Sequence, residues 1–225
     1  SHILLKTAFP VDVNTDKATY DIQFGSVERP THFNTSWDSA RFEVCAHKYS
    51  DISEYGYGVS LINDCKYGHS VHDGVMTLTL LKSGTYPDPT ADKCEHYFTY
   101  SLYPHAGDYR EAGTIKKAYE LNNPMTAMKI DKHSGKLADS YSLVSVKDEN
   151  VVIETIKKAE NGDGIIVRMY ESFNRRTSTV LKTGFDFESV TLCDMLENDL
   201  KVISAKENSI PITLKPFEIV TIKIR

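Results

Sequence analysis

Short runs in which apolar and polar residues alternate cover much of the chain. In the first half such runs lie at residues 20–24, 42–46, 59–61 and 76–80, with glycine and proline residues between them. Alternation with a period of two is typical of β-strands that bury one face. Residues 97–103 carry apolar or hydroxyl side chains on both faces, which suits a strand covered on both sides. The pattern predicts an all-β fold, an antiparallel β-sandwich.

One segment departs from this alternation and predicts a short helix over residues 108–122. Ile115, Ala118, Tyr119 and Asn122 recur at the spacing of one helix face, and Pro124 follows directly after them. We expect this helix to cap a sheet edge or to cross between sheets.

The last third of the chain predicts a second, smaller sandwich. Two β-branched runs, at residues 151–156 and 165–170, flank the sequence Asn-Gly-Asp-Gly at 161–164. Asparagine and glycine readily adopt the positive φ angles of a hairpin turn, so these two runs should pair. Further strands are expected at 179–183, 189–194 and 218–224. We place a domain boundary close to Ser140, which gives domains of residues 1–140 and 141–225.

Charge and composition argue against two classes of partner. The formal net charge is -5, whereas nucleic-acid binding usually needs a basic face. No apolar run approaches the roughly 20 residues of a membrane span. The first residues lack the features of a secretory signal, so the chain either starts inside a longer protein or is cytoplasmic. The four isolated cysteines are expected to be reduced and mostly buried.

Acidic residues in the first half are the candidates for hydrolytic chemistry. A glycoside hydrolase uses two carboxylates about 5–10 Å apart. The candidates are Asp38, Asp51, Glu54, Asp64 and Asp88. The sequence does not pair them, and acidic residues in β loops mostly form solvated turns. We therefore prefer the interpretation that these carboxylates are solvated turn residues.

Two Cys-x-His pairs, Cys45 with His47 and Cys94 with His96, carry groups that bind Zn²⁺. Each pair lies on one face if its segment is a strand, but two separate strands would have to converge to complete a site. Buried cysteines with hydrogen-bonded histidines are the alternative, and we favour it.

Aromatic residues in the loops point to sugar binding, because an aromatic ring packs on the C–H face of a pyranose while amide, carboxylate and ammonium groups bind its hydroxyls. The candidates are Trp37, Tyr49, Tyr55, Tyr57, Tyr67 and Tyr86. The alternative for each is that the ring anchors its loop to the core, and for any single residue this is the preferred interpretation.

Ordered motifs lie along most of the chain, at residues 8–12, 28–38, 41–47, 63–68, 85–92, 98–105, 118–122, 153–160, 167–172 and 215–219. Together they resemble the C-terminal β region of the class II α-mannosidases, glycoside hydrolase family 38. The bacterial and vacuolar-type branch is the most similar. The resemblance implies the larger part of a β-supersandwich followed by a small C-terminal β-sandwich.

The family is retaining and zinc-dependent, and it catalyses from an N-terminal (β/α) barrel that holds the Zn²⁺ and both catalytic aspartates. None of those residues maps onto this chain, so the resemblance implies no catalytic residue and no metal ligand here. It implies instead that the barrel of the same polypeptide is the partner of this region, which is then a fragment or a separate C-terminal portion.

By the same resemblance, one loop of this region reaches the substrate cleft with a basic residue. Lys82 occupies that position, where arginine is expected, and a lysine loses the planar two-pronged contact of a guanidinium. The loop 63–68 is the second candidate for cleft contact, with Asp64, Lys66 and Tyr67. Ser39 replaces a residue that is often aromatic in relatives.

Three hypotheses follow. In the first, the chain completes the cleft of an α-mannosidase without hydrolysing glycosides itself. In the second, it is an independent module that binds mannose-containing oligosaccharide, with Trp37 and Tyr86 among the contacts. In the third, its exposed surface is an interface to the barrel or to a second protomer in a homo-oligomer.

Overall fold

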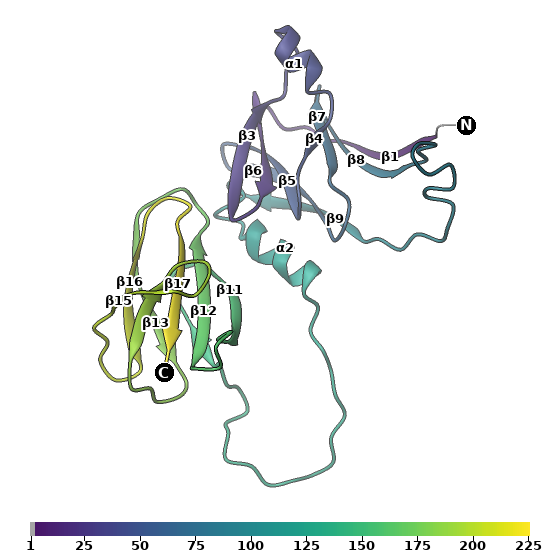
Figure 1. Ribbon diagram of the computed structural model, residues 1–225. Helices are drawn as coiled ribbons and strands as arrows, with labels where there is room; N and C mark the ends of the chain where they lie inside the picture. The colour runs from purple at the N-terminus through teal and green to yellow at the C-terminus, as the bar shows by residue number, and fades with distance from the viewer. Residues whose placement is uncertain (1–2) are drawn as a thin grey trace. The chain divides into compact units, whose positions relative to one another are not determined.

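The computed structural model describes residues 3–225, which divide into two compact units. We call Ser1–Ala127 the N-terminal unit and Met128–Arg225 the C-terminal unit. Each is built from antiparallel sheets, so the predicted all-β class is confirmed (Figure 1). No helix among the described residues is long and apolar enough to cross a membrane.

The N-terminal unit contains two sheets. A four-stranded sheet has the order β1 (Leu4–Pro10), β8 (Val75–Lys82), β7 (Gly68–His72) and β4 (Val44–Cys45). A five-stranded sheet has the order β3 (Gly25–Pro30), β2 (Lys17–Ile22), β5 (Tyr49–Glu54), β6 (Tyr57–Asn63) and β9 (Tyr100–Ala106). Buried residues from both sheets, among them Met76, Leu78 and Leu61, form one core.

Three strand predictions in this unit were wrong in extent. The strand expected at 20–24 is β2, which ends at Ile22. The expected strand at 42–46 is reduced to the two residues of β4, because the preceding segment forms the helix α1 (Ser36–Ala40). Thr35 and Asp38 cap the first turn of α1 reciprocally, each side chain accepting from the other residue's backbone N–H. The strand expected at 97–103 begins only at Tyr100 and runs on to Ala106.

The predicted helix exists as α2 (Thr114–Asn122), which begins later than residue 108. Asp108 accepts from the backbone N–H groups of Arg110 and Glu111, and this turn precedes the helix. Ile115 and Ala118 are buried, and α2 packs against β5 and β6. The helix therefore covers a sheet face.

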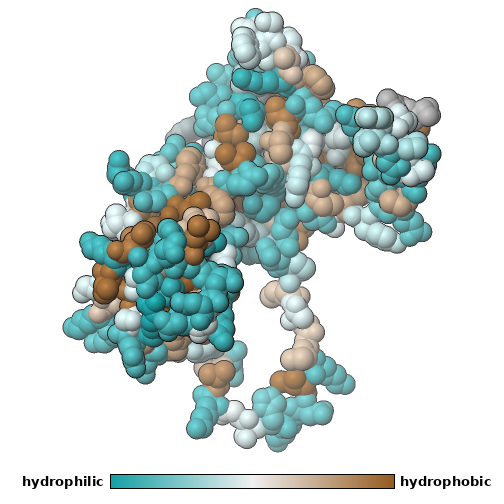
Figure 2. All heavy atoms as spheres, viewed as in Figure 1, coloured by the Kyte–Doolittle hydropathy of each residue, from teal (hydrophilic) through white to brown (hydrophobic). Residues whose placement is uncertain are grey.

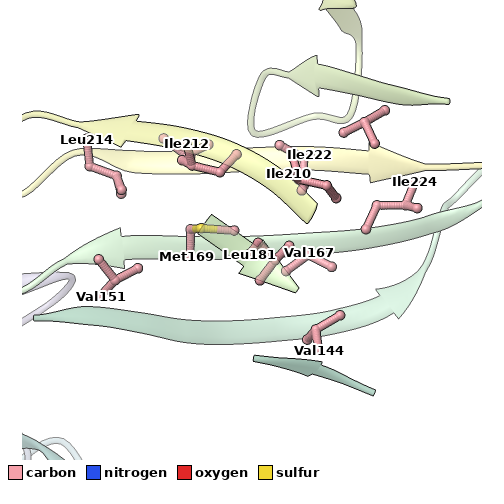
Figure 3. Packing of buried hydrophobic residues seen from close by; sticks show 12 residues of the cluster. Val144, Val151, Val167, Met169, Leu181, Ile210, Ile212, Leu214, Ile222 and Ile224 are labelled. Atoms are coloured by element: carbon pink, nitrogen blue, oxygen red, sulfur yellow. The ribbon is translucent and has the colours of Figure 1, made fainter. Parts of the chain in front are cut away.

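The C-terminal unit is a small sandwich of a five-stranded and a three-stranded sheet. The five-stranded sheet has the order β11 (Val151–Lys158), β12 (Ile165–Glu171), β17 (Ile219–Ile224), β14 (Val190–Cys193) and β15 (Asp199–Val202). The other contains β10 (Val144–Ser145), β13 (Thr177–Thr183) and β16 (Ser209–Leu214). Figure 3 shows residues of both sheets, such as Met169, Ile222 and Leu181, meeting in the core between them.

The predicted hairpin is confirmed as β11 and β12, which pair antiparallel. Gly162 and Gly164 have φ angles of 77° and 102°, as the turn requires. A Cβ atom at Gly164 would also lie 2.5 Å from the carbonyl oxygen of Ile224, so only glycine fits there. The boundary predicted near Ser140 falls in the segment between α2 and β10, and it stays a prediction.

Candidate functional site

The loop 63–68 is held rigidly at its base by Asn63, the last residue of β6. This side chain is fully buried, and its amide donates to the His47 carbonyl at 2.8 Å while its oxygen accepts from the Lys66 backbone N–H at 2.6 Å. Asn122 at the end of α2 donates to the Asn63 carbonyl at 2.9 Å. The loop is therefore fixed to a strand and to a helix at once.

Asp64 joins this loop to the segment that leads into β9. Its carboxylate oxygens accept from the Thr99 backbone N–H at 3.0 and 2.9 Å. Burial raises the pKa of Asp64, but hydrogen bonds from Thr99 and Cys65 outweigh it and the net pKa is lowered. Asp64 is thus an ionised loop clamp whose lone pairs are partly used by the protein itself.

Lys66 and Tyr67 lie at the loop surface. The Lys66 ammonium is 4.8 Å from the centre of the Phe98 ring, a cation–π contact that orients this side chain. The Tyr67 ring is exposed and lies 4.9 Å from the His47 ring. The adjacent residues Lys66 and Tyr67 therefore offer a hydrogen-bond donor and an aromatic ring at the loop surface.

A surface hollow of about 210 Å³ brings Lys66 together with Lys82, although the sequence analysis chose them from separate motifs. Its lining residues are Lys66, Thr79, Leu80, Leu81, Lys82, Asp92 and His96. Lys82 is exposed at the end of β8, and the His96 ring is hydrogen-bonded to the Asp92 carbonyl at 2.9 Å. The sequence did not predict that Asp92 and His96 line this hollow. It marked His96 only for its spacing from Cys94, as a possible zinc ligand.

The candidate aromatic residues separate into core and surface. Tyr49 is 1% exposed and packs 6.0 Å from Tyr109, so it anchors the core. Trp37, Tyr55 and Tyr86 are 74%, 107% and 92% exposed, and the anchoring interpretation is wrong for these three. Trp37 belongs to α1, and neither Trp37 nor Tyr86 lines the hollow.

The other candidate carboxylates bind groups of their own neighbourhood. Asp38 caps α1, Asp88 accepts from Thr90, and Glu54 accepts from the Asn14 backbone N–H at 2.6 Å. Asp51 is buried and accepts from Ser53, Ser60 and His105. Each of these carboxylates stabilises local structure.

The cysteines differ from expectation, because Cys45, Cys65 and Cys94 are exposed and only Cys193 is buried. Short strands and loops carry the three exposed ones. Within residues 3–225, no three His, Cys, Asp or Glu side chains gather in a way that could hold a metal ion. The resemblance places the family's zinc in the N-terminal barrel, not in this chain.

Comparison with known proteins gives matches along both units. The model "Glycosyl hydrolases family 38 C-terminal domain" matches residues 1–90, and "Glycosyl hydrolases family 38 C-terminal beta sandwich domain" matches residues 150–222. These matches define a β-sandwich region of a glycosyl hydrolase. The chain belongs to glycosyl hydrolase family 38 and corresponds to its C-terminal region.

Individual relatives align with nearly the whole chain. It is 41% identical over 99% of its length to Alpha-mannosidase 2C1 of Homo sapiens, and 40% identical over 98% to Alpha-mannosidase of Saccharomyces cerevisiae. In both cases it spans only 22% of the relative. The crystal structure of an alpha-mannosidase from Enterococcus faecalis V583 superposes with a TM-score of 0.82 at 22% identity, covering 99% of this chain and 26% of that one, and so shares the fold.

Acid should weaken the base of the loop through His69. This fully buried ring contacts Asn63 at 3.3 Å and Ser50 at 3.0 Å, and burial lowers its pKa to about 4. An unfolded histidine titrates near pH ~6.5. As the pH falls, the unfolded state therefore binds the proton before the folded state does. The contribution of neutral His69 to the free energy of unfolding is complete above pH ~6.5, and about 3 kcal/mol of it is lost as the pH falls through ~4.

Urea unfolding at pH ~7.5 and ~4.5 of the chain and of His69→Gln measures this effect. The variant, which has no proton to gain, should lose less stability on acidification than the parent. Equal losses in both proteins would show that His69 does not carry the acid sensitivity.

Proposed function

We propose that this chain is the C-terminal portion of a retaining, zinc-dependent α-mannosidase. The observation that carries the proposal is identity of 40–42% along nearly the whole chain to four relatives, each named an alpha-mannosidase. The chain spans about a fifth of their length. In this proposal the preceding part of the polypeptide, a (β/α) barrel, carries the zinc and the catalytic carboxylates.

The role of this chain is to wall the substrate cleft and to bind a mannose-containing oligosaccharide there. Lys66 and Lys82 line one hollow, and their ammonium groups are suited to donate hydrogen bonds to sugar hydroxyls. The exposed rings of Tyr67 and Tyr86 offer faces for sugar C–H groups. The packed base formed by Asn63 and Asn122 keeps the loop in one conformation, which lowers the entropic cost of binding.

Hydrolysis of an aryl α-mannoside tests this proposal. The 225-residue chain should be inactive with or without added Zn²⁺, and the polypeptide extended N-terminally along its reading frame should be active. In the extended protein Lys82→Met should raise KM by about tenfold, the value of one charge-assisted hydrogen bond.

Lys93→Met is the matched control, since Lys93 is exposed in the same region but does not line the hollow. Its KM should stay at the parent value. Turnover by the 225-residue chain that a single carboxylate substitution abolishes would refute the proposal, and an unchanged KM in Lys82→Met would remove Lys82 from the cleft.

A further inference from the structure

The sandwich of the N-terminal unit is closed along one side. There β3 and β4 are the edge strands, and the segment that contains α1 contributes residues between the two sheets. The helix α1 itself projects beyond the ends of the strands (Figure 1). Asp38 and Arg41 from this segment join Tyr20, Val44 and His72 around a cavity of about 10 Å³. A cavity of that size has room for about one water molecule, so this side is well packed.

The opposite side of the sandwich is open. It is formed by the other two edge strands, β1 of the four-stranded sheet and β9 of the five-stranded sheet. The rings of Phe9 and Tyr100 lie with their centres 6.0 Å apart, so these two edges face each other across the core. Each edge strand leaves one row of backbone N–H and C=O groups without a neighbouring strand.

Core-facing side chains are exposed along this side. Leu102 of β9 pairs with Leu61 of β6, and paired residues point to the same face of a sheet. Leu61 is 0% exposed within the core, whereas Leu102 is 39% exposed. Ile3, Leu4, Leu5, Tyr97 and Tyr100 are also exposed here, and we call these residues with Leu102 the open rim.

The open rim lacks the charges that usually protect an edge strand from pairing with another chain. Strand β9 contains no Lys, Arg, Asp or Glu, and β1 contains only Lys6, whose ammonium is paired with Glu43. Among the other edge strands, β3 carries Glu28 and Arg29, and β11 and β15 of the C-terminal unit each carry at least two charged residues. The edge strands β4, β10 and β16 carry none. Figure 2 shows hydrophobic residues reaching the surface of both units. In the N-terminal unit the rim combines exposed apolar side chains with two facing edges.

We propose that the open rim is the docking surface for a β-strand of the same polypeptide that precedes residue 1. The described chain starts at this edge, so residues before it emerge where a strand is needed. The relatives are several times longer than this chain, which leaves ample sequence to supply the strand. The strand that fits is apolar at alternate positions and pairs with β1 or β9. The inference rests on the proposed function in requiring an N-terminal extension.

Hydrogen exchange of the backbone amides tests this docking. Extension of the chain along its reading frame should slow exchange in Leu4–Pro10 or Tyr100–Ala106 by at least about tenfold. Exchange in Gly25–Pro30, the edge strand on the closed side, should not change. Unchanged exchange in both rim strands would overturn the inference, and so would concentration-dependent protection of the same strands in the 225-residue chain, which would identify a second copy as the occupant.

A pair of substitutions gives a second measure. Leu102→Lys should leave the Tm of the 225-residue chain within about 1 °C and lower that of the extended protein by several degrees. Ile156→Lys is the control, since Ile156 is a similarly exposed residue of the edge strand β11, and it should act equally at both lengths. Equal effects of Leu102→Lys at both lengths would also overturn the inference. Mannoside hydrolysis by the extended protein without rim protection would refute the inference alone, and rim protection without hydrolysis would refute the proposed function alone.

Discussion

Replacing Glu171 with alanine is expected to destabilise the C-terminal unit by about 3–5 kcal/mol. The carboxylate is fully buried, and one oxygen accepts from the Asn150 amide and the Phe173 backbone N–H, both at 2.8 Å. The other accepts from the backbone N–H groups of Arg175 and Phe217, both at 3.1 Å. Truncation removes the shared acceptor of all four donors, of which the Asn150 amide is fully buried and keeps only Thr177 as an acceptor. Leaving buried donors without this acceptor costs more than the loss of the bonds themselves.

The measurement is urea unfolding of the chain, with hydrogen exchange to assign the effect to residues 128–225. Glu171→Gln keeps the shape of the side chain, and its free energy of unfolding should lie between those of the parent and the alanine variant. Its amide nitrogen faces donors from which the carboxylate accepted hydrogen bonds. Glu188→Ala removes an exposed carboxylate and serves as the control, with little change expected. A loss below about 1 kcal/mol in Glu171→Ala would contradict the assignment of a supporting role to this cluster.

Replacing Asp51 with asparagine is expected to destabilise the N-terminal unit by about 3 kcal/mol. The buried carboxylate accepts from Ser53 and Ser60, both at 2.6 Å, and from the His105 Nε2 at 2.8 Å. Ser60 is in turn 2.8 Å from the Thr114 hydroxyl, which links the cluster to α2. An asparagine presents only one acceptor oxygen and carries no charge to hold a protonated His105.

The pH dependence of this loss separates the ion pair from mere packing. Burial alone lowers the pKa of His105, but the hydrogen bond and charge of Asp51 outweigh it and raise the pKa above its ordinary value. The folded state therefore holds the proton more tightly than the unfolded state. The pair's contribution is complete below pH ~6.5 and is lost as the pH rises through the folded-state pKa.

Urea unfolding at pH ~6 and ~9 compares the parent with Asp51→Asn. The difference between them should shrink at the higher pH, the opposite direction to the acid effect expected of His69. Asp88→Asn, an exposed carboxylate bound only to Thr90, should show a small difference at both values. A difference that is constant with pH would show that Asp51 acts without a charged His105.

The sequence by itself determined most of the local structure. Alternation of apolar and polar residues located strands such as β6, β8 and β13, because a strand buried on one face imposes its period on the sequence. It did not locate β1, β3, β5, β7, β10, β15 or β16. The hairpin of β11 and β12 was predicted from Asn-Gly-Asp-Gly, and α2 from its helical spacing. Both predictions hold because turn and helix formation depend on interactions among residues close together in the sequence. The predicted ends were misplaced by one to three residues at β9 and β4, because the ends of a strand depend on which neighbouring strand it pairs with.

The sequence predicted some residues of the candidate site but not how they are arranged. Lys66 and Lys82 came from separate motifs, and the sequence did not show that they line one hollow with Asp92 and His96. Likewise Tyr49 and Tyr55 look alike in sequence, yet one is in the core and the other fully exposed. These outcomes depend on which strands pair and which loops meet, so they are set by contacts between residues far apart in the chain.

The buried carboxylates show the same division most clearly. The sequence marked Asp51 only as a candidate hydrolytic carboxylate and did not single out Glu171, and only the folded chain surrounds each with donors from several elements. The open rim, too, exists only because β1 and β9 become edge strands that face each other. Local sequence thus located many of the strands, and tertiary packing decided which side chains are satisfied inside each unit and which surface remains uncovered.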